Sequence, residues 1–426
     1  MKIKIVAVAA CLALCGALTA LSAEPVVLTE PSAIELALQN SLPLKSARIE
    51  LETLRRQRGA SWNALLPSLS AGAGLSGTQD FSGSTGSPWD LSLSLSASLP
   101  LSLSTPYSVR ATALQYQAAA VRLQESEGAL RREVRQSFNA LLLDQEKIAL
   151  LEESMQSASL STEIARRNYA AGLISEVEAL SAEMVLEKLT PQLGKAQADY
   201  RTGLLELQSL LGMGPGATVR LEGSLRVSET QADADALVRD RLASRPDVRA
   251  AFLDVELRRS QSGLAAAQSR SPSASFSYSV TGGAADLAGS GSWSGHGSAR
   301  LSLNIPLDSW LPGSAGQVQV AGAGDELAKA ELALLETRRA AEVEIRSLVM
   351  KLQALAGSLR VLEKSERLAR QVYELRSAEY AAGLTELTVL RQALDDHQQA
   401  GLDLASARLQ YGDALADLEY ATQAAP

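Results

Sequence analysis

The stretch Leu91-Ser92-Leu93-Ser94-Leu95-Ser96-Ala97-Ser98-Leu99 alternates apolar and hydroxyl side chains without interruption. Successive side chains of a β-strand point to opposite faces, so this stretch predicts a strand with one apolar face and one hydroxyl face. Similar alternating patterns at roughly 69–79, 273–281 and 292–305 predict three further strands. Together with the strand at 91–99, they make two β-hairpins. We expect a turn at 82–86 in the first hairpin and a loop that opens at Gly282-Gly283 in the second.

Four such strands predict a membrane wall. A soluble sandwich buries its apolar faces and exposes charged ones, whereas the polar face here consists of small residues. Apolar residues outside and polar residues inside are typical of transmembrane barrels, whose strands need about 9–11 residues. Open strand edges leave backbone groups unpaired in lipid, so several chains would share one barrel, and three chains would supply twelve strands. We expect Leu91, Leu93, Leu95 and Leu99 to face lipid, with an interfacial girdle from Trp89, Trp293, Phe81 and Tyr278.

The chain carries one layout twice. The segment Asn168-Tyr169-Ala170-Ala171-Gly172-Leu173 recurs as Glu379-Tyr380-Ala381-Ala382-Gly383-Leu384, and three other landmarks recur in the same order. This predicts duplication within one architecture. The expected parts are a first repeat at 24–211 (helix, β-hairpin 68–100, long helical hairpin 107–211), an equatorial linker at 212–235, and a second repeat at 236–426 (helix, β-hairpin 273–306, long helical hairpin 313–423).

Each long helical hairpin has coiled-coil spacing. Apolar residues from Ile345 to Leu362, and again from Ile148 to Tyr169, recur in steps of three and four. This spacing is typical of helices that pack side by side as coiled coils. Gly172 and Gly383 each stand between two helical segments, where a glycine commonly ends the first helix in a left-handed conformation. The turns of the two hairpins are therefore expected at these glycines.

Composition excludes most chemistry. The chain of 426 residues has two cysteines, Cys11 and Cys15, and two histidines far apart in sequence, which argues against disulfide, iron–sulfur and metal centres. Asp395-Asp396-His397 lies in a segment predicted to be helical and is expected on a solvated helix face. A formal net charge of −8 disfavours nucleic acid as a partner. No catalytic constellation stands out, so we expect neither an enzyme nor a cofactor.

The N-terminus reads as an export signal. Lys2 and Lys4 precede an uncharged apolar run, and small residues follow near Ala23, which predicts a signal peptide at 1–23. Cys15 leaves lipidation open as an alternative to ordinary cleavage. No later segment has the length of apolar sequence that a membrane-spanning helix needs.

Taken together, these residues resemble the TolC family of outer-membrane efflux channels. The resemblance rests on the duplicated layout, on the segment 169–182, and on Pro100-Leu101 and Pro306-Leu307 at the ends of the hairpins. It covers nearly the whole chain after the signal, although the second copy of the tip segment is one residue shorter before Thr388. The implied fold is mainly α-helical with a membrane β-barrel: a homotrimer with a twelve-strand barrel in the outer membrane and an α-helical barrel extending into the periplasm.

The resemblance also implies partners and sites. Members act with a periplasmic adaptor (membrane fusion) protein and an inner-membrane pump, and they contact outer-membrane lipid. The adaptor-docking candidates are Tyr169, Gly172, Leu173, Tyr380, Gly383 and Leu384. The candidates for a periplasmic gate are Glu176, Glu178, Glu386, Asp395 and Asp396.

Two functions are compatible with these features of the sequence. The first is a passive trimeric channel of a tripartite efflux or type I secretion system. The second is a non-conducting periplasmic coiled-coil scaffold or adhesin. The alternation of leucine and serine favours the channel, because a scaffold has no use for strands with a lipid-facing side.

Overall fold

The structure is a computed structural model that describes residues 26–77, 89–214, 218–224, 232–284 and 293–422. The predicted signal peptide at 1–23, the expected turn at 82–86 and Phe81 lie outside the described residues. The described residues divide into two compact units. The first unit contains 26–45, 126–242 and 341–422, and the second contains 46–125 and 243–340. Each unit therefore combines residues from both halves of the chain.

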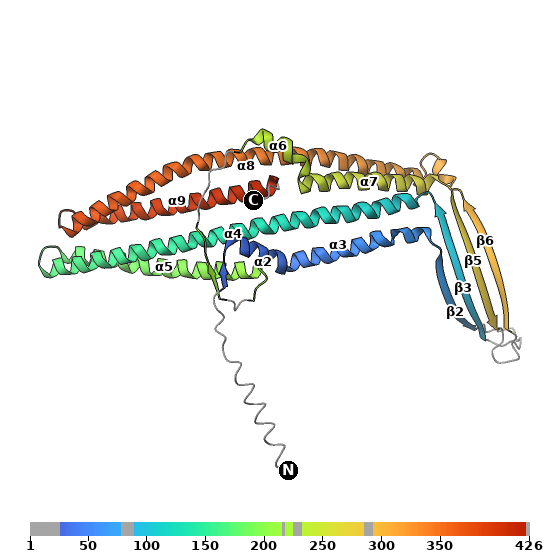
Figure 1. Ribbon diagram of the computed structural model, residues 1–426, viewed down its shortest axis with the longest axis horizontal. Coiled ribbons are helices and arrows are strands. Elements are labelled where there is room, and N and C mark those ends of the chain that lie inside the picture. Colours follow the sequence, from blue (N-terminus) through green and yellow to red (C-terminus); the bar gives the residue numbers. More distant parts are fainter. Residues whose placement is uncertain (1–25, 78–88, 215–217, 225–231, 285–292, 423–426) are drawn as a thin grey trace, which may run out of the picture. The chain divides into compact units, whose positions relative to one another are not determined.

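The order of elements occurs twice along the chain (Figure 1). The first series is α3 (Leu42–Ala60), β2 (Ser68–Gly77), β3 (Trp89–Ser102), α4 (Thr105–Ala170) and α5 (Glu176–Leu210). The second series is α7 (Pro246–Arg270), β5 (Ser273–Ala284), β6 (Trp293–Asn304), α8 (Ala315–Ala381) and α9 (Leu387–Thr422). The smaller elements are β1 (Val26–Leu28), α2 (Glu30–Asn40), η1 (Ser61–Leu65), β4 (Val219–Leu221), α6 (Ala234–Arg241), η2 (Leu242–Ser244) and η3 (Asp308–Trp310).

In the first unit, α8 and α9 pack through a heptad seam. Buried residues at intervals of seven on α8 are Ile345, Leu352 and Leu359. They belong to one cluster with residues at the same interval on α9: Leu404, Tyr411 and Leu418. Identical intervals on two antiparallel helices keep their apolar stripes facing each other along the whole contact. The coiled-coil spacing predicted from sequence is therefore confirmed for this hairpin.

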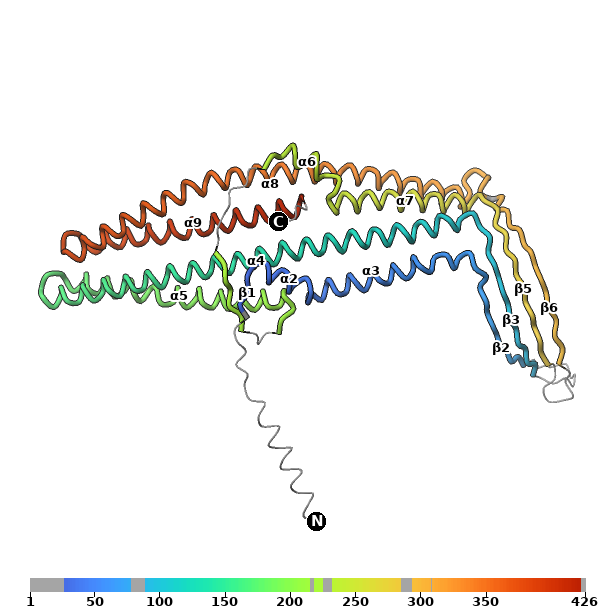
Figure 2. The backbone as a smooth tube through the Cα atoms, in the orientation of Figure 1, coloured from blue at the N-terminus to red at the C-terminus, as the bar shows by residue number. Residues whose placement is uncertain are grey.

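Polar contacts join α4 to α9 in the same unit. Arg135 of α4 forms ion pairs with Glu419 of α9 and with Glu30 of α2. The amide of Gln136 donates to Asp417 at 3.1 Å, and the guanidinium of Arg132 lies 4.5 Å from the centre of the Tyr420 ring. Charge-assisted hydrogen bonds of this kind hold long helices in a fixed register. The short strands β1 and β4 pair in parallel. Figure 2 labels β1 and traces the backbone of the chain.

In the second unit, α7 packs closely on the start of α4. The Ser260 hydroxyl donates to the backbone carbonyl of Tyr107 at 2.9 Å, and Arg110 forms an ion pair with Glu256 at 2.7 Å. Gly263 lies against the Tyr107 ring, where an added Cβ would be 2.4 Å from a ring atom. The absence of a side chain at Gly263 is what lets the ring lie so close to α7.

The sheet of the second unit has the order β2-β3-β5-β6, and every neighbouring pair is antiparallel. The prediction of a loop from Gly282-Gly283 is wrong, because β5 continues through both glycines to Ala284. The Trp293 ring covers Gly282, and Tyr278 covers Gly297. An aromatic ring laid over a strand glycine restores packing that the glycine lacks, which explains why the strand persists here.

The half-buried carboxyl of Asp413 on α9 gives the fold a dependence on pH. Burial, together with the charge of Asp417, raises its pKa to about 6, and Lys351 of α8 opposes the shift. One of its oxygens has no hydrogen-bond partner in the described part of the chain. Because the folded pKa lies above the ordinary value of 3.8, ionised Asp413 opposes folding. This destabilisation is present above pH 6 and disappears as the pH falls toward 4.

We predict that Asp413→Asn stabilises the protein at pH 8 by about 1–2 kcal/mol. This free energy is smaller than the raised pKa alone implies, because water partly screens the carboxylate charge. At pH 4 the variant and the parent chain are expected to unfold at the same temperature. Thermal unfolding of the detergent-solubilised protein at both pH values measures the difference. Asp403→Asn, at an exposed position of the same helix, is the control and should show no such dependence. Equal stability of Asp413→Asn and the parent at pH 8 would contradict the prediction.

Candidate functional site

The four-stranded sheet has one face of hydroxyls. In β3, Ser98 stands opposite Ser68 of β2 and Ser277 of β5, and Ser96 stands opposite Ser70 and Ser279. Many of these hydroxyls bond to one another across the strands, at oxygen–oxygen distances of 2.6–2.8 Å. The pairs are Ser68–Ser98, Ser70–Ser96, Ser275–Ser302 and Ser279–Ser298. The register thus brings the hydroxyl positions of all four strands onto one face, as the alternation predicted.

The opposite face is apolar and largely exposed. Leu91, Leu93, Leu95 and Leu99 share it with residues of the other three strands, because each is paired with another apolar or glycine position. Leu95, for example, stands between Ala71 and Val280. The large exposed side chains on this face include Leu69, Leu75, Leu93, Leu95, Phe276, Tyr278, Leu301 and Leu303. A contiguous exposed apolar face of this kind marks an interaction surface.

Exposed tryptophans lie near both ends of the strands. Trp89 and Trp293 begin β3 and β6, where a girdle residue is expected, whereas Tyr278 lies in the middle of β5, away from the strand ends. At the opposite ends, Trp62 of η1 precedes β2 and Trp310 of η3 follows β6, and both are exposed. The alternating pattern of the strands does not point to Trp62 or Trp310. Their position in the sequence could have done so, since each tryptophan stands in the short connection between a helix and a strand.

The two helical hairpins end in the same backbone motif. At the first turn, Gly172 has φ 71° and its N–H donates to Tyr169, while the Leu173 N–H donates to Asn168. At the second, Gly383 has φ 73° and the N–H groups of Gly383 and Leu384 donate to Tyr380 and Glu379. These are Schellman caps, which need a left-handed residue and therefore glycine. The predicted glycine turns are confirmed.

The apolar residues at these turns differ in exposure. Leu173 is 73% exposed and Leu384 is 79% exposed, so both project from the turns. Tyr169 is 46% exposed, whereas Tyr380 is only 9% exposed. Burial raises the pKa of the Tyr380 hydroxyl, and the nearby charge of Glu178 raises it further. Tyr380 is thus a packing residue as much as a surface residue, although the two tyrosines occupy equivalent places in sequence.

The acidic candidates have different surroundings. Glu178 forms a capping box at the start of α5, in which its carboxylate accepts from the Ser175 N–H at 3.1 Å. Glu176 lies in the same first turn, and Glu386 precedes α9 and accepts from the Thr388 hydroxyl at 3.3 Å. Asp395 and Asp396 are exposed on α9. The structure therefore gives Glu178 a local structural role and leaves the two aspartates available for contacts with other molecules.

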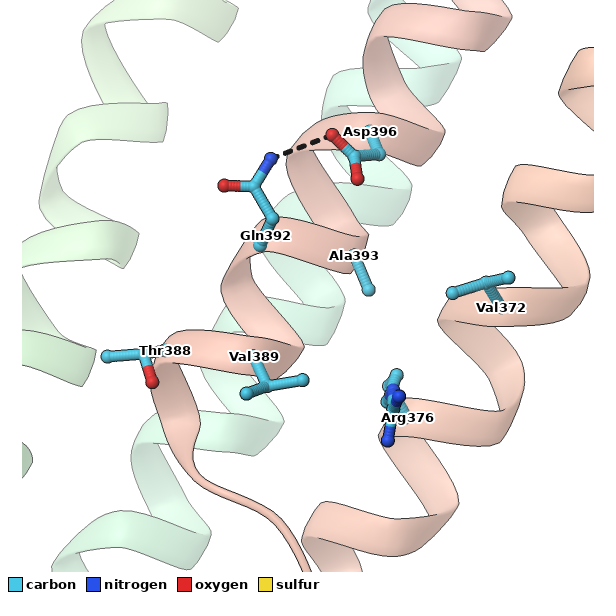
Figure 3. Close-up of a pocket in the computed structure, with 7 residues that line it drawn as sticks. All are labelled: Val372, Arg376, Thr388, Val389, Gln392, Ala393 and Asp396. Carbon is cyan, nitrogen blue, oxygen red and sulfur yellow. Dashed lines mark hydrogen bonds between the residues drawn. The ribbon is translucent and has the colours of Figure 1, made fainter.

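A shallow groove of about 350 Å³ lies between α8 and α9 beside the second turn (Figure 3). Val372 and Arg376 of α8 face Val389 and Ala393 of α9 across it. Gln392 donates to Asp396 at 2.8 Å along one wall. The groove combines an apolar floor with Arg376 on α8, which forms an ion pair with Glu379 at 2.6 Å, and with Asp396 on α9.

His397 is buried, and this corrects the expectation of a solvated face for Asp395-Asp396-His397. The ring is 4% exposed and stacks on Tyr373 of α8 with ring centres 5.6 Å apart. His397 occupies the heptad position seven residues before Leu404, so counting back along the seam would have found it. In the described part of the chain, no three His, Cys, Asp or Glu residues are grouped to hold a metal ion.

Comparisons with known proteins agree with this arrangement. The sequence profile of the family described as "Outer membrane efflux protein" matches residues 33–213 and 237–422. No curated protein sequence matches the chain significantly. No helix in the described residues combines the length and apolar character needed to cross a membrane.

Among the solved structures that share the fold, three illustrate the similarity. One is CusC, described in terms of folding and transmembrane channel formation (TM-score 0.78, 18% identity, 92% of this chain and 91% of that chain). The second is the outer membrane channel CmeC of Campylobacter jejuni (TM-score 0.76, 19% identity, 92% and 85%). The third is the outer membrane protein VceC of Vibrio cholerae (TM-score 0.76, 20% identity, 92% and 95%).

The family match covers most of the chain, and the matched ranges contain the sheet and both helical hairpins. The chain belongs to the outer membrane efflux protein family and is an outer-membrane efflux channel of the TolC type, not an enzyme, that extends into the periplasm.

Proposed function

We propose that three copies of this chain form one passive channel, which completes a tripartite efflux system between an inner-membrane pump and the cell exterior. Channels of this family are trimers that act with adaptor and pump partners. The observation that carries the proposal is the sheet with a hydroxyl face and an apolar face in every strand. Such a sheet suits lipid on one side and water on the other.

The two open edges of the sheet support closure between copies. β2 and β6 are the edge strands. Because neighbouring strands alternate in direction, β6 of one copy runs antiparallel to β2 of the next copy. Three sheets joined in this way make an antiparallel barrel without edges, and every backbone group within the lipid then has a partner.

The dimensions of the sheet support its position in the membrane. β2 has 10 residues and β5 and β6 have 12 each, which matches the length a tilted spanning strand needs. Trp89 and Trp293 at one end, with Trp62 and Trp310 at the other, supply aromatic residues for both lipid–water interfaces. Leu91, Leu93, Leu95 and Leu99 lie in the lipid-facing band between them. A scaffold or adhesin leaves this exposed apolar band without a role.

The hairpin turns are the proposed docking site of the adaptor. The exposed side chains of Leu173 and Leu384 and the groove beside Arg376 form a surface that suits the apolar stripe of a partner helix. The Schellman turns at Gly172 and Gly383 fix the positions of the two leucines, and the backbone carbonyls of Tyr169 and Tyr380 accept hydrogen bonds within these turns. Among the gate candidates, Glu178 is the weakest, because its carboxylate caps its own helix. The proposed gate opens by a change in the packing of the hairpins.

Closure of the barrel predicts disulfide cross-links between chains. Within one chain β2 and β6 are three strand spacings apart, about 14 Å, which exceeds the reach of a disulfide. Ser70→Cys combined with Ser294→Cys, Ser298→Cys or Ser302→Cys should therefore cross-link only between copies. For at least one of the three pairs, we expect a covalent trimer on a non-reducing gel.

The control is Ser70→Cys with Ser96→Cys, whose native hydroxyls lie 2.6 Å apart in one chain. This pair should form a disulfide and migrate as a monomer. If the control pair is oxidised while all three test pairs remain monomeric, closure through β2 and β6 is wrong.

Docking at the turns predicts a separation of two activities. The double variant Leu173→Glu and Leu384→Glu should keep its trimer and its conductance in planar bilayers, because both side chains are exposed. Its affinity for the adaptor, measured on the detergent-solubilised channel, should fall by about tenfold or more, since each apolar contact is replaced by a charge. The matched control, Leu173→Met and Leu384→Met, keeps apolar contacts and should bind normally. Unchanged adaptor affinity in the glutamate variant would refute the docking assignment.

A further inference from the structure

The hydroxyl face of the sheet carries an isolated cation. Arg300 on β6 stands opposite Ser277 of β5, and the same row continues through Ser98 of β3 to Ser68 of β2. Arg300 is exposed and therefore projects from the hydroxyl face. In the described part of the chain it has no ion-pair partner. A guanidinium among serines, rather than beside a carboxylate, is free to bind a solute.

The strands contain no nearby counter-charge. Asp90 is the acidic residue of the described strands, and it lies on β3 eight residues from Ser98, about 26 Å at the usual strand rise. That distance is several times the screening length of about 8 Å at physiological ionic strength. Within the sheet, Asp90 therefore does not neutralise Arg300.

A neighbouring copy adds no counter-charge either. The strand that would join β6 across the interface is β2, with the sequence Ser-Leu-Ser-Ala-Gly-Ala-Gly-Leu-Ser-Gly, which has no charged residue. This holds for every register in which β2 and β6 can pair. Assembly therefore leaves Arg300 without a partner from the strand beside it.

We propose that Arg300 forms a ring of three cations in the lumen of the barrel, which attracts and transiently binds solutes that carry carboxylate or phosphate groups. The inference rests on the proposed trimeric channel. A guanidinium presents several donors in a planar fork that matches carboxylate and phosphate oxygens. Because the chain as a whole is acidic, with 48 acidic and 40 basic residues, the ring stands out from its surroundings. It makes the barrel the anion-selecting part of the conduit.

Reversal potentials across planar bilayers test the ring, with the purified trimer in a potassium chloride gradient near 0.1 M. At that salt concentration the screening length is about 10 Å, so Asp90, about 26 Å away along the strands, still has little effect on the ring. Arg300→Gln should lower the ratio of chloride to potassium permeability by about twofold or more, and Arg300→Glu should lower it further. Arg300→Lys keeps the charge and should resemble the parent chain. At 1 M salt the differences should disappear.

A second variant varies the charge within one folded protein. Arg300→Cys treated with a cationic thiol reagent should recover the parent's anion preference, whereas an anionic reagent should shift it toward cations. Parent protein given the same reagents, and Ser277→Ala in the same row, are the controls and should keep the parent's reversal potential. If all Arg300 variants conduct with the reversal potential of the parent, the ring is wrong and the channel stands. If the parent itself does not conduct, the proposed function is wrong.

Discussion

Backbone hydrogen bonding in lipid is the constraint on which the rest of the structure depends. A peptide group without a partner in hydrocarbon costs several kcal/mol, so a sheet with two open edges is not stable in a bilayer as a single chain. The strand order β2-β3-β5-β6 leaves such edges, while its alternating directions allow copies to join. The duplication that put two hairpins in one chain therefore supplies a fraction of a wall. The proposed trimer completes that wall.

The long helices depend on a second constraint, the heptad interval between their buried residues. Equal intervals let the apolar stripes of two helices match over a long contact. The seam through Ile345, Leu352 and Leu359 meets a seam of equal interval on α9, so contact extends along the helices without a large globular core. Alanine at buried positions such as Ala407 and Ala414 lets the helix axes come close together. The aromatic content of 4% is low because neither a heptad seam nor a hydroxyl wall needs many rings.

Much of this architecture follows from short-range patterns in the sequence. The alternation of apolar and hydroxyl residues predicted which face of each strand is apolar, and Gly172 and Gly383 predicted both turns. Both features depend on residues that are neighbours along the chain. Features that depend on long-range contacts were missed or wrong. Gly282-Gly283 reads as a loop unless Trp293 is known to cover it, and Asp395-Asp396-His397 reads as a polar face until α8 brings Tyr373 against the histidine. Tyr169 and Tyr380 are equivalent in sequence, yet only the second is buried.

The serine pairs across the strands have a consequence for transport. A hydroxyl that already bonds to its neighbour, as Ser70 does to Ser96, has less capacity to hold a passing molecule. Rows of such pairs make a wall that is wetted by water but has few strong points of attachment. A channel that must release every solute it admits benefits from a wall that binds solutes weakly. Paired serines provide such a wall, because they lack the strong charge interactions of ionised groups and the large contact area of aromatic rings.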